Sequence, residues 1–82
     1  MAWVLHQAKG QCESCLAPAP FLREDGSAYL EVHHVQRLID GGADTVENAI
    51  AVCPNCHRQL HYGADKKALA EAIRQRIERL GK

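Results

Sequence analysis

The sequence has few aromatic residues, no long apolar run and no excess of charge of either sign. Aromatic side chains make up 5% of the 82 residues, and the ten basic residues balance ten acidic ones. Proteins that bind single-stranded nucleic acid tightly on their own usually combine a basic groove with stacking aromatic rings. This composition therefore argues against a tight stand-alone nucleic-acid binder. No apolar run approaches the roughly 20 residues that span a bilayer, which predicts that the protein has no membrane partner.

The first residues also lack the features of a secretory leader. The segment 1–9 is too short and too polar to contain the apolar centre of a signal peptide. We therefore expect a cytoplasmic protein, in which paired cysteines bind metal more often than they form disulfides. The helix that we expect over 2–8 has no N-cap residue, which leaves open that the sequence is a fragment of a longer protein.

A chain of this length is expected to form one small domain over residues 1–82. It can bury only about 60–65% of the surface that its unfolded form exposes, so the hydrophobic core supplies little stability. Small domains usually need a disulfide or a structural metal in addition. The four cysteines of the sequence are the candidates for that role.

The cysteines form two Cys-x-x-Cys pairs, Cys12 with Cys15 and Cys53 with Cys56. Each pair can place two thiolates on one side of a tight turn, and two such turns complete a tetrahedral shell that suits zinc. Because thiolates fill all four positions, we expect this zinc to be structural rather than reactive. Two disulfides or a redox pair are the alternatives, but no thioredoxin-like pattern surrounds either pair.

The residue pattern predicts alternating short helices and strands. We expect helices over 2–8 and 54–61 and strands over 29–33 and 49–53. Asp65 is expected to cap a final helix that extends to Leu80. The apolar residues of this last helix recur at helical spacing and predict one face that covers the core: Leu69, Ile73, Ile77 and Leu80.

Histidines are concentrated near the second cysteine pair. His57 and His61 are four positions apart on the expected helix and therefore share a face, a standard spacing for two ligands of one ion. His33, at the end of the first strand, can add a third imidazole. Three imidazoles leave coordination positions open, as in a catalytic site. The adjacent His34 is then free to act as a base on water, if the strand bends at its end.

These residues resemble a known family. Glu31-x-His33-His34, then Asn48, then His57 within a Cys-x-x-Cys-His run are similar to the motif of the HNH endonucleases, and the resemblance covers about 12–61. It implies an α+β, ββα-metal (treble-clef-like) fold, with a short antiparallel hairpin and helices joined by a four-cysteine zinc. It also implies a metal-dependent DNA endonuclease.

The resemblance also implies a role for each residue of the motif. His34 matches the general base, and His33 and His57 match metal ligands. His61 matches the third ligand of the colicin-type DNases, although it could also be an exposed helix residue. Asn48 matches the residue that holds the loop and orients the base. Glu31 matches an acid that orients an imidazole, although alone it could be an ordinary polar residue of the strand.

Phosphodiester hydrolysis requires a water in line with the leaving oxygen, a base to take its proton and a cation to stabilise the phosphorane. A neutral imidazole can be the base near pH 7, and cleavage by this route leaves 5′-phosphate and 3′-hydroxyl ends. The catalytic ion is expected to be Mn²⁺, Mg²⁺, Ni²⁺ or Zn²⁺, with imidazole ligands favouring the ions other than Mg²⁺. The alternative function is a non-catalytic zinc module that binds nucleic acid or a protein.

The expected partner is double-stranded DNA, and Arg37 and Arg58 are the candidates for phosphate contacts near the site. Basic residues outnumber acidic ones after His57, which favours a phosphate-facing surface in that part of the chain. A homodimer is plausible on chemical grounds because a double-strand cut requires two cleavage events. His6 matches no part of the motif and is expected to be a surface residue.

Overall fold

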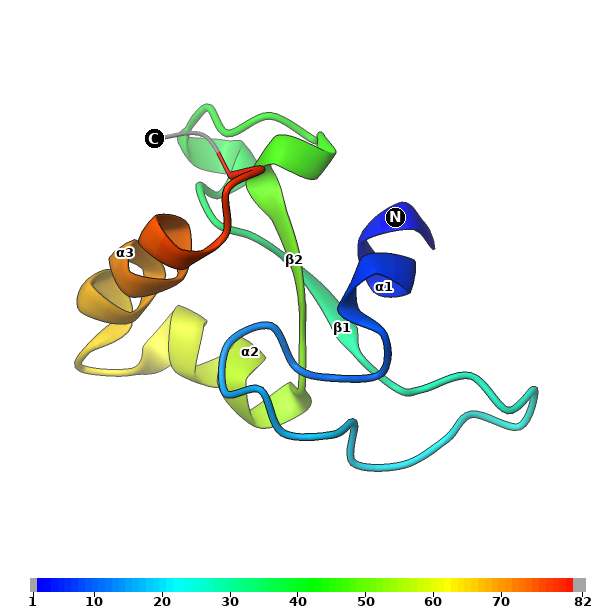
Figure 1. The fold of residues 1–82 in the computed structure, drawn as a ribbon. Coiled ribbons are helices and arrows are strands. Elements are labelled where there is room, and N and C mark those ends of the chain that lie inside the picture. The colour runs from blue at the N-terminus through cyan, green and yellow to red at the C-terminus, as the bar shows by residue number, and fades with distance from the viewer. Residues whose placement is uncertain (1, 81–82) are drawn as a thin grey trace.

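The computed structural model describes residues 2–80 and consists of a two-stranded antiparallel hairpin surrounded by helices (Figure 1). β1 covers Glu31–His34 and β2 covers Ala49–Val52. The register pairs Glu31 with Val52 and His34 with Ala49. Two short 3₁₀ turns, Leu38–Asp40 and Val46–Asn48, lie in the connection between the strands. The α+β prediction, with its hairpin, helices and clustered cysteines, is confirmed.

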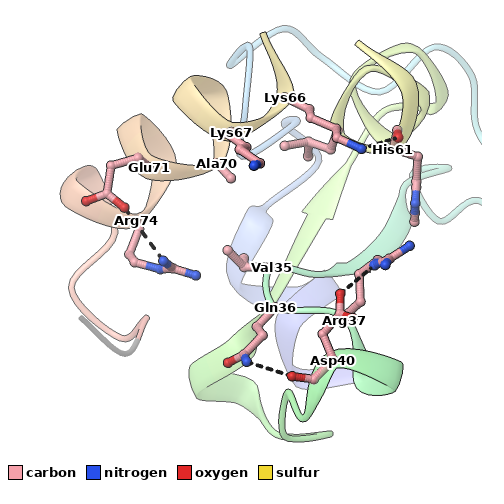
Figure 2. A pocket seen from close by; sticks show the side chains of 11 residues that line it. Val35, Gln36, Arg37, Asp40, His61, Lys66, Lys67, Ala70, Glu71 and Arg74 are labelled. Atoms are coloured by element: carbon pink, nitrogen blue, oxygen red, sulfur yellow. Dashed lines mark hydrogen bonds and ion pairs between the residues drawn. The ribbon is translucent and has the colours of Figure 1, made fainter. Parts of the chain in front are cut away.

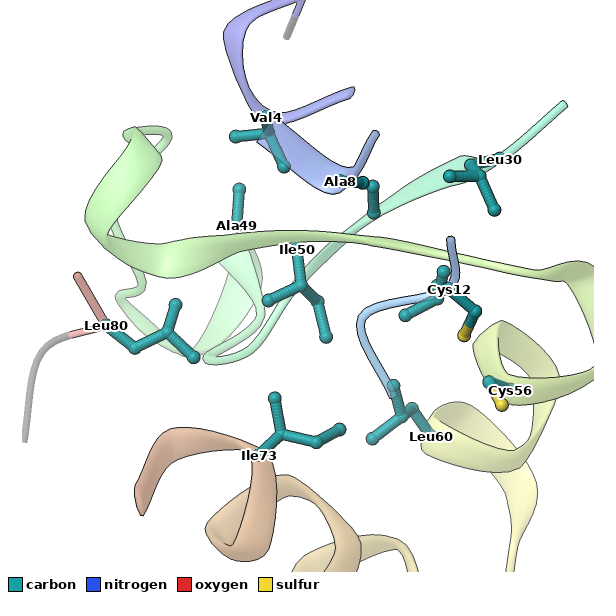
Figure 3. Close-up of a cluster of buried hydrophobic side chains, with 12 residues drawn as sticks. Val4, Ala8, Cys12, Leu30, Ala49, Ile50, Cys56, Leu60, Ile73 and Leu80 are labelled. Carbon is teal, nitrogen blue, oxygen red and sulfur yellow. The ribbon is translucent and has the colours of Figure 1, made fainter. Parts of the chain in front are cut away.

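Three α-helices cover this hairpin. α1 spans Ala2–Ala8, α2 spans Pro54–Tyr62 and α3 spans Lys66–Arg76. α1 lies on one side of β2, and α2 and α3 lie on the other (Figures 1 and 3). None of the helices within residues 2–80 is long and apolar enough to cross a membrane.

The core is built around β2, whose four residues are all fully buried. Such a strand is covered on both faces and therefore reads as a continuous apolar run, Ala-Ile-Ala-Val, rather than as an alternating one. Val4 of α1 packs on one face, and Leu60 and Ile73 of the two later helices pack with Ile50 on the other (Figure 3). The hairpin is thus packed between helices, and this packing fixes the positions of the residues in both strands.

The first strand is shorter at its start than expected and longer at its end. The prediction was 29–33, whereas β1 runs from Glu31 to His34. Tyr29 and Leu30 do not pair with β2, because β2 ends opposite Glu31, at Val52; the Tyr29 N–H instead donates to the Phe21 carbonyl at 3.0 Å. Cys53, expected in the second strand, instead caps α2 and accepts a hydrogen bond from the Cys56 N–H at 3.5 Å. His34 is therefore the last residue of a regular strand, and the chain bends directly after it, at Val35 and Gln36.

The final helix is also shorter than expected. α3 ends at Arg76, and Ile77 is extended, with φ −101° and ψ 111°. Its expected capping residue, Asp65, makes no side-chain cap bond and instead accepts hydrogen bonds from Gln59 at 3.2 and 3.3 Å. The helix ends early because Arg79 must reach back to Glu13 and Leu80 must reach the core. The apolar face itself is as predicted: Ile73 and Leu80 are buried and Leu69 and Ile77 pack against the core.

Candidate metal and catalytic site

The four cysteines come together although they belong to two distant segments. Their sulfur atoms all lie within 4.8 Å of one another, and none of the four is in a disulfide. In each pair, backbone N–H groups point at a sulfur: Ser14 and Cys15 donate to Cys12 Sγ, both at 3.4 Å, and Cys56 donates to Cys53 Sγ at 3.5 Å. These bonds stabilise thiolates, as expected for two turns that bind one metal ion.

The donor chemistry of this cluster fits a zinc ion. Burial raises the pKa of Cys56 to about 12, so this thiol does not ionise near neutral pH without a cation beside it. Burial also works to raise the pKa of Cys12, but backbone hydrogen bonds from Cys53, Cys15 and Ser14 lower it to about 7. Four thiolates this close would repel one another, and a divalent ion removes that repulsion. The four cysteines form a zinc site.

Three histidines form a second cluster, which also includes residues of α2. Nitrogen atoms of His33, His57 and His61 all lie within 4.8 Å of one another. The Nε2 atoms of His57 and His61 are only 3.3 Å apart, and the His33 ring lies 5.3 and 4.9 Å from the other two ring centroids. β1 supplies His33, and one face of α2 supplies the other two. Three convergent imidazole nitrogens are a suitable ligand set for a divalent transition metal.

Glu31 fixes the orientation of one of these rings. Its Oε1 lies 2.8 Å from His57 Nδ1, so Nε2 of His57 remains available to the cluster. The other carboxylate oxygen, Oε2, accepts a hydrogen bond from the Tyr29 hydroxyl at 2.7 Å. Hydrogen bonds from His57 and then from Tyr29 lower the pKa of Glu31, which therefore stays ionised and keeps the proton of His57 on Nδ1.

Tyr29 is a site residue that the sequence reasoning missed. It had been placed in the strand as a β-former, but its hydroxyl holds the acid that orients His57. Its ring stacks on Phe21 with centroids 4.6 Å apart, and the Arg23 guanidinium lies 4.6 Å from the Tyr29 ring centroid. The available signal was its spacing, because residues two apart in extended chain point to the same side.

Two histidines of the cluster, His33 and His61, have a lowered pKa and are neutral near pH 7. Burial, and then the neighbouring His61, His57 and His34, lower the pKa of His33 from 6.5 to about 4. Burial and then His57, Arg37 and Lys66 lower the pKa of His61. A neutral imidazole presents a lone pair, so both rings can act as ligands without first losing a proton.

His34 contacts Asp44, a residue of the connection between the two strands. Its Nε2 lies 2.8 Å from Asp44 Oδ1. When the carboxylate accepts a hydrogen bond from the Nε2–H group, the lone pair of the neutral ring is on Nδ1. The carboxylate can also stabilise the imidazolium that forms when the ring takes a second proton. Asp44 could not be found from spacing, because it reaches His34 only through the fold of the intervening loop.

Asn48 holds that loop in place. Its Nδ2 donates to the carbonyls of Gln36 and Ala43, both at 2.8 Å, and its Oδ1 accepts from the Gln36 N–H at 2.8 Å. Gly42 lies so close that a Cβ there would overlap the Gln36 carbonyl and come within 2.9 Å of the Asn48 amide. One side chain therefore joins both ends of the loop that carries Asp44 to the end of β1.

The structure separates the two arginines proposed to contact phosphate. Arg37 lies beside His61 in a groove and bonds Asp40 at 2.8 Å. Arg58 is exposed on α2 and does not line that groove. His6 is exposed on α1, as expected.

A hairpin followed by a helix, with a four-thiolate zinc site and a three-imidazole cluster that both include residues at the start of α2, defines a small ββα-metal domain. The chain belongs to the HNH endonuclease family: the model of that family, described as HNH endonuclease, matches residues 12–63, more than half of the chain. The resemblance stated from the sequence is thereby confirmed, and the chain is an HNH endonuclease domain.

Two relatives are similar over most of this chain. The chain is 56% identical over 81 residues to the type IV methyl-directed restriction enzyme EcoKMcrA of Escherichia coli (strain K12), covering 99% of this chain and 29% of that protein. It is 39% identical, with a TM-score of 0.74, to the structure of the type IV phosphorothioation-dependent restriction endonuclease ScoMcrA, covering 85% of this chain and 14% of that one. The chain thus spans less than a third of either relative.

Proposed function

We propose that this domain hydrolyses phosphodiester bonds of DNA, with one divalent ion at the histidine cluster and His34 as the general base. The observation that carries the proposal is the convergence of His33, His57 and His61 within 4.8 Å, with His34 next to His33 on β1. Three imidazoles favour Mn²⁺, Ni²⁺ or Zn²⁺ over Mg²⁺. When bound, such an ion supplies positive charge to the phosphate and to the leaving oxygen.

The chain's own residues supply the rest of the reaction. His34 takes a proton from water as the water oxygen bonds to phosphorus, and Asp44 stabilises the resulting imidazolium. The bond between phosphorus and the 3′ oxygen then breaks, and that oxygen takes a proton from solvent. The products are a 5′-phosphate and a 3′-hydroxyl. Glu31 and Asn48 act by holding the His57 ring and the loop beside His34 in position.

The relatives support DNA as the substrate, since both are described as restriction enzymes. We propose for this chain only the cleavage step on duplex DNA, in the cytoplasm, with two copies required to cut both strands. Selection for methylated or phosphorothioated sites is a property of the relatives as whole proteins, most of whose length this chain does not span.

Plasmid nicking tests the proposal. Zinc-loaded protein should nick supercoiled DNA when Mn²⁺, Ni²⁺, Zn²⁺ or Mg²⁺ is added, and DNA ligase should reseal the product because ligation requires a 5′-phosphate and a 3′-hydroxyl. His34→Ala should reduce nicking by about 10²- to 10⁴-fold, the usual contribution of a general base. His6→Ala is the matched control and should cut as wild type. Wild-type protein that gives no metal-stimulated nicking, or a His34→Ala variant that cuts normally, overturns the proposal.

A further inference from the structure

An open groove of about 660 Å³ begins at the histidine cluster (Figure 2). One wall is the segment after β1, the other is α3, and His61 lies at one end. The two walls belong to different parts of the fold, because α3 begins after residue 63, where the family match ends. The groove is therefore formed by the HNH core together with a helix outside it.

The charged side chains of the groove are mostly basic. Arg37 and Arg74 each have an acidic neighbour, Asp40 at 2.8 Å and Glu71 at 3.6 Å. Of the residues 2–80, none provides a carboxylate within ion-pair distance of Lys66 or Lys67. The uncompensated positive charge is thus at the end of α3 nearest His61.

One contact connects this charge to the metal cluster. Lys66 Nζ lies 3.5 Å from the His61 carbonyl oxygen. Arg37 and Lys66 also line the groove together with His61. An anion at the histidine cluster would therefore have cations continuing along one side of it.

A nucleic acid strand matches this arrangement. Its phosphates are a row of negative charges, and each Lys or Arg that neutralises one releases a condensed counterion. Lysines and arginines along a groove position the backbone and leave the bases unread. An isolated small anion would need only one of these cations, whereas the groove continues to Arg74 on the third turn of α3.

We propose that the groove binds the DNA backbone on one side of the scissile phosphate, with Lys66, Lys67 and Arg74 of α3 contacting successive phosphates. This inference rests on the proposed nuclease function, since it places the scissile phosphate at the histidine cluster. It makes α3 a part of the substrate site, and it gives the basic C-terminal region of the chain a specific role.

Salt-dependent binding of a short, unmodified DNA duplex tests this surface. The measurement uses the zinc-loaded protein with His34→Ala, so that the probe is not cut, and follows affinity from about 50 to 200 mM salt. Adding Lys66→Gln or Lys67→Gln should weaken binding and reduce the slope of log K against log salt by about 0.9 each. Lys9→Gln, at an exposed position directly after α1 and outside the groove lining, is the matched control and should leave the slope unchanged.

A change of opposite sign gives a second readout. Glu71→Gln removes an acid from the groove and frees Arg74, so it should tighten binding and steepen the salt dependence. Glu24→Gln, an exposed acid in the segment before β1, is its control and should have no effect. The Glu71→Gln result tests the groove even if Lys66→Gln disturbs the start of α3.

The outcomes separate the two proposals. If Lys67→Gln and Glu71→Gln behave as their controls while metal-stimulated nicking still requires His34, the groove is not the DNA path and the inference is wrong, but the nuclease function stands. If wild-type protein neither binds the duplex nor nicks plasmid, both fail. Opposite shifts for Lys67→Gln and Glu71→Gln, with unchanged controls, support the groove.

Discussion

Glu31 accepts a hydrogen bond from His57 Nδ1 at 2.8 Å, and this contact directs the other nitrogen of His57 toward His33 and His61. A strand residue thus sets the direction of a helix residue, and both belong to the same candidate metal site. The Tyr29 hydroxyl in turn holds Glu31 at 2.7 Å. Partners of this kind fix the ring of a ligand and raise its basicity.

Removing either partner should weaken metal binding at the histidines. Glu31→Gln should reduce the affinity for Mn²⁺ or Ni²⁺ by about 10- to 100-fold. Tyr29→Phe keeps the ring stacked on Phe21 and deletes one hydrogen bond worth about 1 kcal/mol, so it should cost about fivefold. Tyr62→Phe, whose side chain is 82% exposed, is the control. Calorimetric titration of zinc-loaded protein measures all three, and a Tyr29→Phe affinity equal to that of Tyr62→Phe would exclude a role for the hydroxyl.

Asp44→Asn should slow cleavage without changing metal affinity. The asparagine oxygen can still accept a hydrogen bond from the Nε2–H of His34, but it carries no charge to stabilise the imidazolium. We expect kcat to fall by less than it does in His34→Ala, for which the expected loss is about 10²- to 10⁴-fold, and we expect KM to stay unchanged. Asp25→Asn, in an exposed loop, is the matched control. Wild-type rates for Asp44→Asn would show that His34 acts without this carboxylate.

Acid should destabilise the fold through His33. Its pKa is about 4 in the folded chain against an ordinary value of 6.5. Between these values the unfolded state binds more protons, so the free energy of unfolding should fall as pH drops from 6.5 to 4, and the contribution is fully present above 6.5. For this single group the loss is about 3 kcal/mol.

Urea unfolding of zinc-loaded protein at a series of pH values measures this effect. His33→Gln should lose less stability between pH 6.5 and 4 than wild type, whereas His6→Gln, at an exposed position, should lose as much as wild type. Any loss of zinc from the cysteines in acid is common to all three proteins and cancels in the comparison. Equal pH dependence in the two variants would contradict the assignment to His33.

Arg79→Met should destabilise the fold more than other arginine substitutions. Arg79 contacts the Glu13 carboxylate at 2.6 and 3.0 Å and the Ala49 carbonyl at 3.0 Å, joining the end of the chain to the first zinc turn and to β2. Breaking one partner of such a largely buried pair costs about 3 kcal/mol. Arg58→Met, at an exposed position, is the control. A loss below about 0.5 kcal/mol, as for surface pairs, would mean that the contact does not contribute.

Much of the fold was predictable because it follows from local chemistry. Pro54 after Cys53 predicts a helix start, and α2 begins there. The apolar run 49–52 predicts a buried strand, and β2 occupies those four residues. The predicted ends of β1 and α3 were wrong, because each end depends on a partner elsewhere in the chain. The pairing of β1 stops opposite Val52. α3 ends at Arg76, and the chain after it is extended, so that Arg79 contacts Glu13.

The same division holds for the candidate site. Metal ligands must be particular residue types at particular spacings. The sequence therefore predicted two candidate ligand sets that the structure brings together, the four cysteines and the three histidines, and it also predicted the family. The contact of Asp44 with His34 could not be assigned from the sequence, nor could the basic groove between α3 and the segment after β1. Both exist only when separate segments pack together, and packing across such distances leaves no periodic pattern in the sequence.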